Sequence, residues 1–218
     1  MAISQMDDIL PGRFSPDLPQ PYHPNQSPAR GCLRAFSTLH LLAVSHLMGP
    51  AEINAAIAAL AAEIIRKRPR GHFSLVGIRS RGDEVAERLQ KSLAEAGRSG
   101  IELGVLDISL YRDDFSHRRE NPTLQSTEIP FSIDGSHIIL CDDVLFTGRT
   151  IRAALDALSD YGRPSRIELA CLIDRGHREL PIQADYVGHS ISTERSTYVD
   201  VKLLKTDGED SVTLPDIP

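Results

Sequence analysis

The sequence has few cysteines, no excess of positive charge and no long apolar segment. Cys32, Cys141 and Cys171 lie too far apart for a CxxC metal or redox pair, and two of them are within apolar runs. This pattern is typical of reduced thiols and predicts a cytoplasmic protein. Lys and Arg total 24 against 30 Asp and Glu, a net charge of −6, so no global field attracts nucleic acid or membranes. Any polyanion must therefore be bound by a local cluster of arginines.

No segment of the sequence is typical of membrane insertion or secretion. The longest apolar stretch, residues 39–48, is interrupted by His40, Ser45 and His46 and is too short to span a bilayer. The first residues lack the basic start and compact apolar core of a secretion signal. We therefore expect no association with membranes.

The two ends of the sequence differ in composition from its centre. Residues 1–31 contain six prolines and little hydrophobic periodicity, so they bury too little surface to offset the entropy of ordering. Residues 33–48 are compatible with a short amphipathic helix, although Met48 before Gly-Pro is equally compatible with a translation start. We expect three parts: a Pro-rich, disordered extension or misassigned start over 1–48, a folded domain over 49–205, and a solvated acidic tail over 206–218.

Between these ends, helical and extended patterns alternate, and 218 residues with 41% hydrophobic content suit one domain. Apolar residues recur at spacings of three and four over 51–67, which is typical of one helix face. The same kind of pattern predicts helices at 82–95 and 150–161. Short apolar runs of strand length predict strands at 73–78, 101–110, 137–141 and 166–173. The alternation indicates an α/β fold with a mostly parallel, twisted sheet flanked by helices, which binds ligands at the carboxyl ends of its strands.

The most informative segment is residues 138–150, in which an apolar strand ends in two carboxylates and a Thr-Gly turn opens a helix. Asp142 and Asp143 suit the paired hydroxyls of a ribose with Mg²⁺ nearby. Gly148 permits close approach of the backbone, and the following N–H groups favour a phosphate at the helix start. An ordinary turn with one acidic helix cap would leave the second carboxylate unexplained. The motifs GxGxxG and GxxxxGK followed by Ser or Thr are absent.

This segment resembles the binding motif of type I phosphoribosyltransferases for phosphoribosyl pyrophosphate (PRPP). Further stretches resemble the PyrR family, which unites a pyrimidine operon regulator and a uracil phosphoribosyltransferase; they are residues 106–114, 144–154, 162–165 and 174–182. The resemblance runs from about Ile53 to Val201. It implies the type I phosphoribosyltransferase fold, a small hood near residues 174–199, and a homo-oligomer, either a dimer or higher.

Carried over residue by residue, the resemblance implies a PRPP site built from three segments. Asp142 and Asp143 are implied to be catalytic, near a Mg²⁺ ion held mainly through PRPP, and catalytic Arg112 lies in a polar loop over 111–127. The ribose and 5′-phosphate would be bound by Asp142, Asp143, Val144, Leu145, Phe146, Thr147, Gly148, Arg149 and Thr150. The pyrophosphate loop would consist of Arg79, Ser80, Arg81 and Gly82, whose donors suit the leaving group.

The resemblance also assigns residues outside these segments. It places Arg175 of the hood beside the active site and Val199 against the base. It places Lys67, His177 and Arg178 on an RNA-facing surface, so that these three side chains are not assigned to the chemistry.

Two functions of different kinds follow from this resemblance. We predict an enzyme that joins uracil to PRPP and forms UMP and pyrophosphate. The alternative is mainly an RNA-binding attenuation regulator that responds to UMP or PRPP. RNA-binding relatives present Thr-Arg-x-x-His on the first helix, whereas the matching positions here are Ala58, Ala59 and Ala62, so we favour the enzyme. A phosphoribosyltransferase for a purine or orotate would keep the PRPP motif but lose the PyrR-specific stretches.

Overall fold

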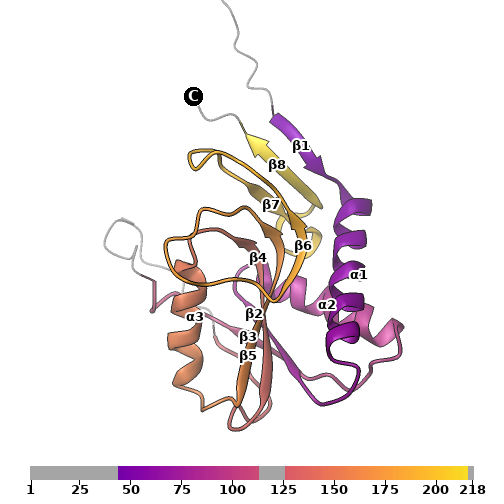
Figure 1. Cartoon of the computed structure of the whole chain (residues 1–218), viewed down its shortest axis with the longest axis vertical. Helices are drawn as coiled ribbons and strands as arrows, with labels where there is room; N and C mark the ends of the chain where they lie inside the picture. The colour runs from indigo at the N-terminus through magenta and orange to yellow at the C-terminus, as the bar shows by residue number, and fades with distance from the viewer. Residues whose placement is uncertain (1–43, 113–125, 216–218) are drawn as a thin grey trace, which may run out of the picture. The chain divides into compact units, whose positions relative to one another are not determined.

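The computed structural model describes residues 44–112 and 126–215, which form two sheets and four helices (Figure 1). The larger sheet has five parallel strands in the order β3-β2-β4-β5-β6. These strands are β2 (Ser74–Ile78), β3 (Leu103–Leu106), β4 (His137–Leu145), β5 (Arg166–Asp174) and β6 (Tyr186–Ser190). The helices are α1 (Pro50–Lys67), α2 (Gly82–Glu95), α3 (Arg149–Ser159) and the short α4 (Leu204–Asp207).

Helices cover both faces of the larger sheet, and Figure 1 shows α1 and α2 on the side opposite α3. Ile139 of β4 belongs to one buried cluster with Leu60 of α1 and Leu89 of α2. The next residue, Leu140, belongs to a second cluster with Leu158 of α3. Neighbouring strand residues face opposite sides of a sheet, so both faces of β4 bury apolar surface. This arrangement confirms the predicted α/β fold.

Two strands differ from their predicted bounds by several residues, and both differences shape the sheet edge. β3 ends at Leu106 rather than at residue 110, because the Asp107 carboxylate accepts hydrogen bonds from the Ser109 N–H and hydroxyl and closes a turn. β4 continues through Asp142 to Leu145, since it remains paired with β5 along that length. The two carboxylates are therefore part of a strand and not of the loop after it.

A second sheet of three antiparallel strands, in the order β1-β8-β7, joins two distant parts of the chain. Its strands are β1 (Val44–Met48), β7 (Asp200–Lys202) and β8 (Ser211–Pro215). Residues 44–48 thus form a strand rather than a helix end, and the fold extends beyond both predicted domain boundaries. Met48 and the fully buried Val212 belong to the same core cluster as α1, which explains why these segments are ordered.

The acidic residues of the predicted tail have cationic partners. Asp207 pairs with Arg81 at 2.8 Å and Asp210 with Arg88 at 2.6 Å. The prediction of a solvated tail was therefore wrong for residues 206–215, because these carboxylates dock the segment on α2 and the loop before it. Residues 1–43, 113–125 and 216–218 lie outside the described residues, and with them most of the predicted extension and most of the predicted catalytic loop.

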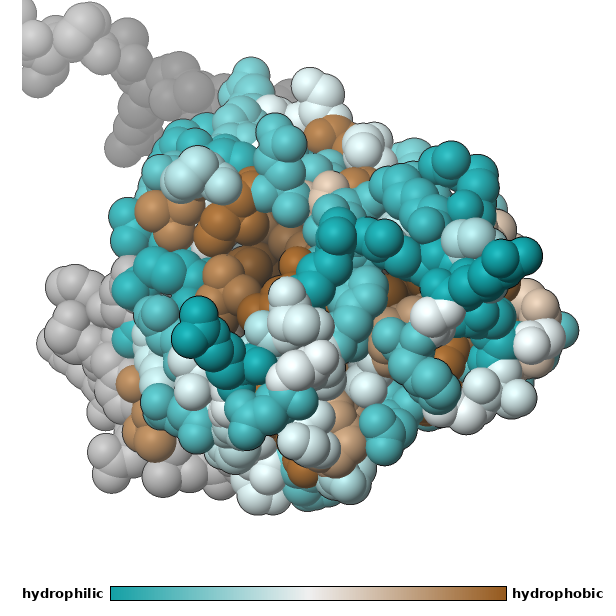
Figure 2. All heavy atoms as spheres, turned by 60° about the horizontal axis from the view of Figure 1, so that its bottom comes forward, coloured by the Kyte–Doolittle hydropathy of each residue, from teal (hydrophilic) through white to brown (hydrophobic). Residues whose placement is uncertain are grey.

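Hydrophilic side chains cover most of the face seen in Figure 2, and apolar atoms are visible mainly in hollows between them. Within residues 44–112 and 126–215, no helix has both the length and the apolar character needed to cross a bilayer.

Candidate active site

A pocket of about 390 Å³ opens at the carboxyl ends of β2, β3 and β4. It brings together residues that are far apart in sequence, and its lining consists of Ile78, Arg79, Ser80, Arg81, Asp107, Ile108, Ser109, Arg112, Asp142, Asp143, Val144, Thr150 and Tyr198. The predicted carboxylates, the predicted pyrophosphate loop and Arg112 thus share one cavity. Three arginines and three buried or half-buried aspartates line it, which suits a ligand that carries both phosphates and hydroxyls.

The loop after β2 approaches the end of β4 closely. A Cβ atom added at Gly82 would lie 2.6 Å from the carbonyl oxygen of Cys141, so only glycine fits there. Arg81 precedes it with a φ of 73°, in the left-handed region that non-glycine residues seldom adopt. The Arg79 N–H donates to the carbonyl of Leu106, which ties this loop to the end of β3. These constraints place the loop donors within reach of the strand carboxylates.

Asp142 and Asp143 form a carboxylate pair that is removed from water. Asp142 is only 4% exposed and accepts a hydrogen bond of 3.1 Å from the Asp143 N–H. The Asp143 carboxylate in turn accepts one of 2.8 Å from the Val144 N–H. Desolvation raises the pKa of both carboxyls, and the charge of Asp143 raises the pKa of Asp142 further. Such a pair is stabilised by a bound cation or by hydroxyl groups that donate to it.

The turn after β4 has the form of an anion cradle. Gly148 has a φ of 91° and is the N-cap of α3, which begins at Arg149. The first N–H groups of an α-helix lack partners within the helix, and its dipole favours negative charge there. A Cβ atom added at Gly148 would lie 3.3 Å from Ile182, so the segment after β5 packs directly on the turn. The turn is therefore fixed before any ligand arrives.

Arg178, which belongs to the predicted hood, holds this turn in place through hydrogen bonds. Its guanidinium donates to the carbonyl oxygens of Phe146 at 2.9 Å and Ile182 at 3.0 Å, and to the Asp174 carboxylate at 2.6 Å. Further bonds reach the carbonyls of Leu145 and Gly176. These donors are used within the chain, which differs from the RNA-facing role that the resemblance implies for Arg178.

The other residues assigned to the hood or to RNA lie outside the pocket lining. Arg175 is 5% exposed, and its guanidinium lies 4.1 Å from the centre of the Phe146 ring. The Val199 side chain belongs to the core cluster, whereas its neighbour Tyr198 lines the pocket. His177 Nε2 lies 2.6 Å from the carbonyl oxygen of Thr193. Neither the Arg175 side chain nor the Val199 side chain therefore lines the pocket.

Lys67, also assigned to RNA, lies at the end of α1 and is held by local contacts. Its ammonium group donates to the carbonyl of Asp185 at 2.6 Å, pairs with Glu63 at 2.9 Å and lies 4.9 Å from the centre of the Tyr186 ring. The exposed positions Ala58 and Ala62 precede it on the helix. This surface therefore offers a polyanion little free charge from the assigned residues.

Sequence reasoning missed Asp107, Ser109 and Tyr198 as lining residues. The predicted strand over 101–110 hid the first two, because a residue inside a strand is not expected to reach the pocket. A polar Asp-x-Ser turn directly after an apolar run was the available signal. Tyr198 has no such signal, since it comes from the far end of the hood.

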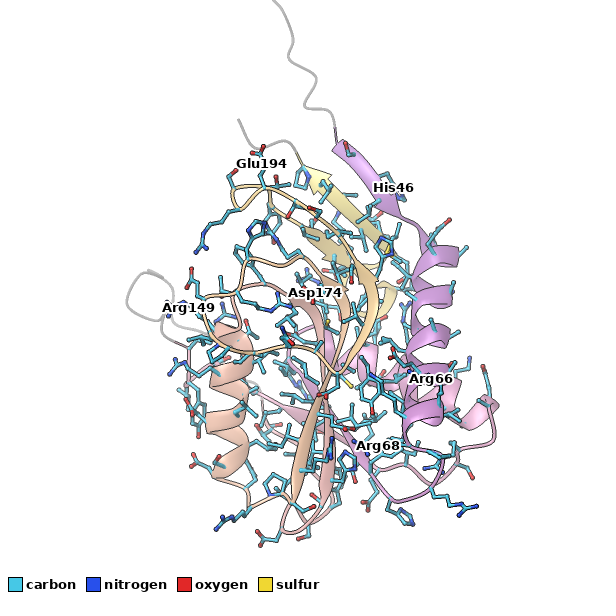
Figure 3. All side chains as sticks on the ribbon, in the orientation of Figure 1. His46, Arg66, Arg68, Arg149, Asp174 and Glu194 are labelled. Atoms are coloured by element: carbon cyan, nitrogen blue, oxygen red, sulfur yellow. The ribbon has the colours of Figure 1, made fainter. Side chains whose placement is uncertain are left out.

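Another buried carboxylate lies toward the opposite end of the sheet. Glu168 of β5 is 3% exposed and accepts hydrogen bonds from Arg68, Arg166 and Tyr186, with His137 Nε2 at 3.0 Å. Although desolvation acts to raise it, these partners lower the pKa of Glu168 to about 2. Figure 3 shows Arg66 and Arg68 at this end, and Arg149, Asp174 and Glu194 at the other. We assign this cluster a structural role.

Comparison with known proteins agrees with this geometry. Residues 50–205 match the phosphoribosyl transferase domain family. The bifunctional protein PyrR of Elusimicrobium minutum is 54% identical over 164 residues, which cover 75% of this chain and 92% of that protein. The bifunctional protein PyrR of Thermus thermophilus is 50% identical over 172 residues, covering 78% and 94%. This chain belongs to the PyrR family of phosphoribosyltransferases.

Solved structures place the PyrR-family chain in the same fold as more distant enzymes. A hypoxanthine-guanine phosphoribosyltransferase from Bacillus anthracis has a TM-score of 0.61 at 15% identity, covering 79% of this chain and 98% of that one. A hypoxanthine phosphoribosyltransferase from Trypanosoma cruzi has a TM-score of 0.62 at 17% identity, covering 81% and 93%. At such low identity the likeness shows the type I phosphoribosyltransferase fold alone. The matched residues 50–205 of the PyrR-family chain contain the whole pocket lining.

Proposed function

We propose that this PyrR-family chain is a uracil phosphoribosyltransferase that converts uracil and PRPP into UMP and pyrophosphate. The observation that carries the proposal is the shared cavity of Asp142, Asp143 and the loop arginines Arg79 and Arg81. Carboxylates accept hydrogen bonds from ribose hydroxyls, and arginines bind phosphate oxygens. The relatives at about 50% identity extend this assignment to the PyrR branch of the family.

The reaction requires little covalent chemistry from the protein. As pyrophosphate leaves, positive charge develops on the ribose ring in a transition state like that of glycoside hydrolysis. The buried carboxylates of Asp142 and Asp143 stabilise this charge, while Arg79, Arg81 and Arg112 stabilise the departing pyrophosphate. Correct alignment of uracil N1 with ribose C1 then supplies much of the remaining rate. The helix start at Thr147–Thr150 anchors the 5′-phosphate during this displacement.

The pocket fits Mg²⁺ as a cofactor that binds together with PRPP. Its candidate ligands are carboxylate and hydroxyl oxygens, which hard cations prefer. Among the described residues, no group of three or more His, Cys, Asp or Glu is arranged to hold a metal, so Asp142 and Asp143 would share the ion with phosphate oxygens. When bound, the metal supplies charge neutralisation for the pyrophosphate group.

The base would lie under the hood, at Tyr198 and Val199. Because the Val199 side chain is buried in the core, contact with the base falls to its main chain or to the half-exposed Tyr198 ring. Arg175 supports this region by donating to the carbonyls of Glu194 and Arg195.

The decisive assay measures product formation from PRPP with uracil, guanine, hypoxanthine and orotate, each with Mg²⁺ and after chelation. We expect UMP from uracil alone and no turnover without the metal. Turnover of a purine or orotate by folded protein that ignores uracil would refute the substrate assignment.

A second function, binding of RNA as an attenuation regulator, is favoured by the name bifunctional protein PyrR that the relatives carry. We propose that this activity is weak here, because Ala58, Ala59 and Ala62 offer no contacts and Arg178 is used within the chain. Titration with the leader RNA of the organism's pyrimidine genes at physiological salt, with and without UMP, tests this. Nanomolar binding enhanced by UMP and resistant to unrelated RNA would restore the regulator as the main function.

Light scattering would test the proposed homo-oligomer.

A further inference from the structure

The C-terminal segment reaches the candidate active site through one ion pair. Arg81 Nε and Nη2 donate to the two carboxylate oxygens of Asp207, each at 2.8 Å, so the contact is bidentate. Arg81 belongs to the loop after β2 and lines the pocket, whereas Asp207 is the last residue of α4. Two parallel hydrogen bonds fix the plane of a guanidinium as well as its position. Asp207 therefore determines where the charge of Arg81 lies.

Asp207 is itself held in place. Its Oδ2 atom accepts a hydrogen bond of 2.9 Å from the Leu203 N–H, and its own N–H donates to the Leu203 carbonyl at 2.7 Å. The hydrogen bonds from Arg81 keep the pKa of Asp207 below its usual value, and Asp207 raises the pKa of Arg81. Both groups stay charged at neutral pH.

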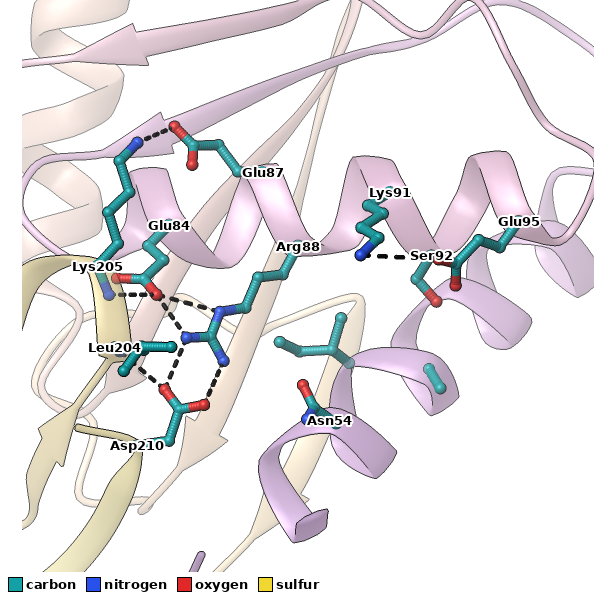
Figure 4. Close-up of a pocket in the computed structure, with 12 residues that line it drawn as sticks. Asn54, Glu84, Glu87, Arg88, Lys91, Ser92, Glu95, Leu204, Lys205 and Asp210 are labelled. Atoms are coloured by element: carbon teal, nitrogen blue, oxygen red, sulfur yellow. Dashed lines mark hydrogen bonds and ion pairs between the residues drawn. The ribbon is translucent and has the colours of Figure 1, made fainter. Parts of the chain in front are cut away.

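Other contacts attach the same segment to α2 without Asp207. Glu84, which is 3% exposed, accepts hydrogen bonds from the N–H groups of Lys205 and Thr206. Arg88 bridges Glu84 and Asp210, as Figure 4 shows. The surrounding groove has a volume of about 640 Å³, and its charged groups are largely paired with one another. This pairing marks the groove as the place where the C-terminal segment docks on α2 rather than as a ligand site.

Arg81 also lies near the carboxylate pair. The charges of Asp143 and Asp200 both act on its guanidinium, in addition to that of Asp207. Arg81 and Asp143 line the same pocket, so a guanidinium released from Asp207 and turned toward Asp143 would compete with the sugar hydroxyls for that carboxylate. The ion pair with Asp207 therefore keeps the Arg81 guanidinium at the pyrophosphate site and away from the ribose site.

We propose that Asp207 is a positioning residue that holds Arg81 for the pyrophosphate group of PRPP. This inference rests on the proposed function. It assigns the C-terminal segment, which the sequence suggested was a solvated tail, a part in substrate binding that acts through Arg81.

The test compares three full-length variants by calorimetric titration with PRPP, pyrophosphate and UMP in the presence of Mg²⁺. Asp207→Asn should weaken PRPP and pyrophosphate binding by roughly 10-fold to 100-fold, the effect of a misplaced charged donor. UMP binding should stay within about twofold, because UMP has the ribose and 5′-phosphate but no pyrophosphate. Asp207→Glu should restore part of the lost affinity.

Asp210→Asn is the matched control, because it removes a bidentate pair between the same segment and α2 without touching Arg81. It should lower the melting temperature and leave PRPP binding unchanged. Equal losses for PRPP and UMP in Asp207→Asn, unchanged PRPP binding in that variant, or a PRPP defect of the same size in Asp210→Asn would overturn the inference. Failure of the unaltered protein to bind PRPP would instead overturn the proposed function, and the inference with it.

Discussion

Asp142 and Glu168 lie on the adjacent strands β4 and β5, and both are almost completely buried. Glu168 accepts hydrogen bonds from two arginines and from Tyr186, so its negative charge is neutralised within the fold. Asp142 lies beside a second carboxylate, Asp143, and accepts a hydrogen bond from a backbone N–H. As a result, the pKa of Glu168 falls to about 2, whereas that of Asp142 rises well above its ordinary value.

This difference separates a structural carboxylate from a ligand-binding one. Buried charges are costly unless they are paired, and native proteins pair nearly all of them. An incompletely compensated pair in a cavity is thus maintained despite its effect on stability, which is typical of a functional site. Glu168, by contrast, needs no ligand to complete it.

The largest expected effect is on catalysis at the Asp142 end. Asp142→Asn with Asp143→Asn should lower kcat/KM by about 30-fold to 1000-fold, because the negative charge that stabilises the developing positive charge on the ribose is lost. The same variant should have a melting temperature at least as high as the unaltered protein, since two repelling buried carboxylates are removed. Steady-state kinetics and calorimetry measure both, with the exposed Asp156→Asn on α3 as control. Near-normal turnover in the folded double variant would contradict the assignment.

At the Glu168 end the effect should fall on stability instead. Glu168→Gln removes the negative charge and one of the two acceptor oxygens that Arg68, Arg166 and Tyr186 share, and should cost about 1 to 3 kcal/mol of unfolding free energy. We place it in this range because Arg166 is 54% and Arg68 30% exposed, so water partly replaces the lost partner. Denaturant unfolding gives the value, and kcat/KM of the folded variant should be unchanged. A selective loss of activity would show that the two ends are coupled.

Acid should change the contributions of Glu168 and Asp142 to the free energy of unfolding in opposite directions. The pKa of Glu168 is lowered in the fold, so its stabilising contribution is present above about pH 4.5 and is lost as the pH falls toward 2. The pKa of Asp142 is raised, so its destabilising effect is present at neutral pH and vanishes below pH 3.8. Unfolding curves from pH 7 to pH 2.5 should therefore converge for Glu168→Gln and the unaltered protein. The stability advantage of the double variant Asp142→Asn with Asp143→Asn should also shrink over that range. A difference in unfolding free energy that grew in acid would contradict the upward shift of the Asp142 pKa.

The smallest change tests one member of the Glu168 cluster. Tyr186→Phe removes a single hydrogen bond of 2.8 Å and leaves the ring in the core, so it should cost about 1 kcal/mol. The double variant with Glu168→Gln should cost less than the sum of the two, because both substitutions act on the same hydrogen bond. Additive costs in the cycle would show that the bond contributes nothing.

The grouping of residues around Asp142 can be read from the sequence, whereas the grouping around Glu168 cannot. Asp142, Asp143 and the following turn are contiguous, so their chemistry is visible in one segment together with its strand and helix. Two partners of Glu168, His137 and Arg68, lie 31 and 100 residues away, and no local pattern joins them to it. The same holds for Arg81 and Asp207, which are 126 residues apart. Long-range pairing depends on topology, and periodicity reports only local structure.

Pairing of β1 with β8 and docking of Asp207 on Arg81 have a consequence for synthesis of the protein. A ribosome that has released residues up to about 174 has delivered the larger sheet except β6, all three long helices and the PRPP segment. β1 at that stage still lacks its neighbour β8, and Arg81 lacks its carboxylate. Because domains begin to fold as they emerge, we expect this chain to have an exposed strand edge and an unanchored loop at that stage of synthesis. A truncated product ending before residue 207 would therefore carry every recognisable motif and still bind PRPP poorly.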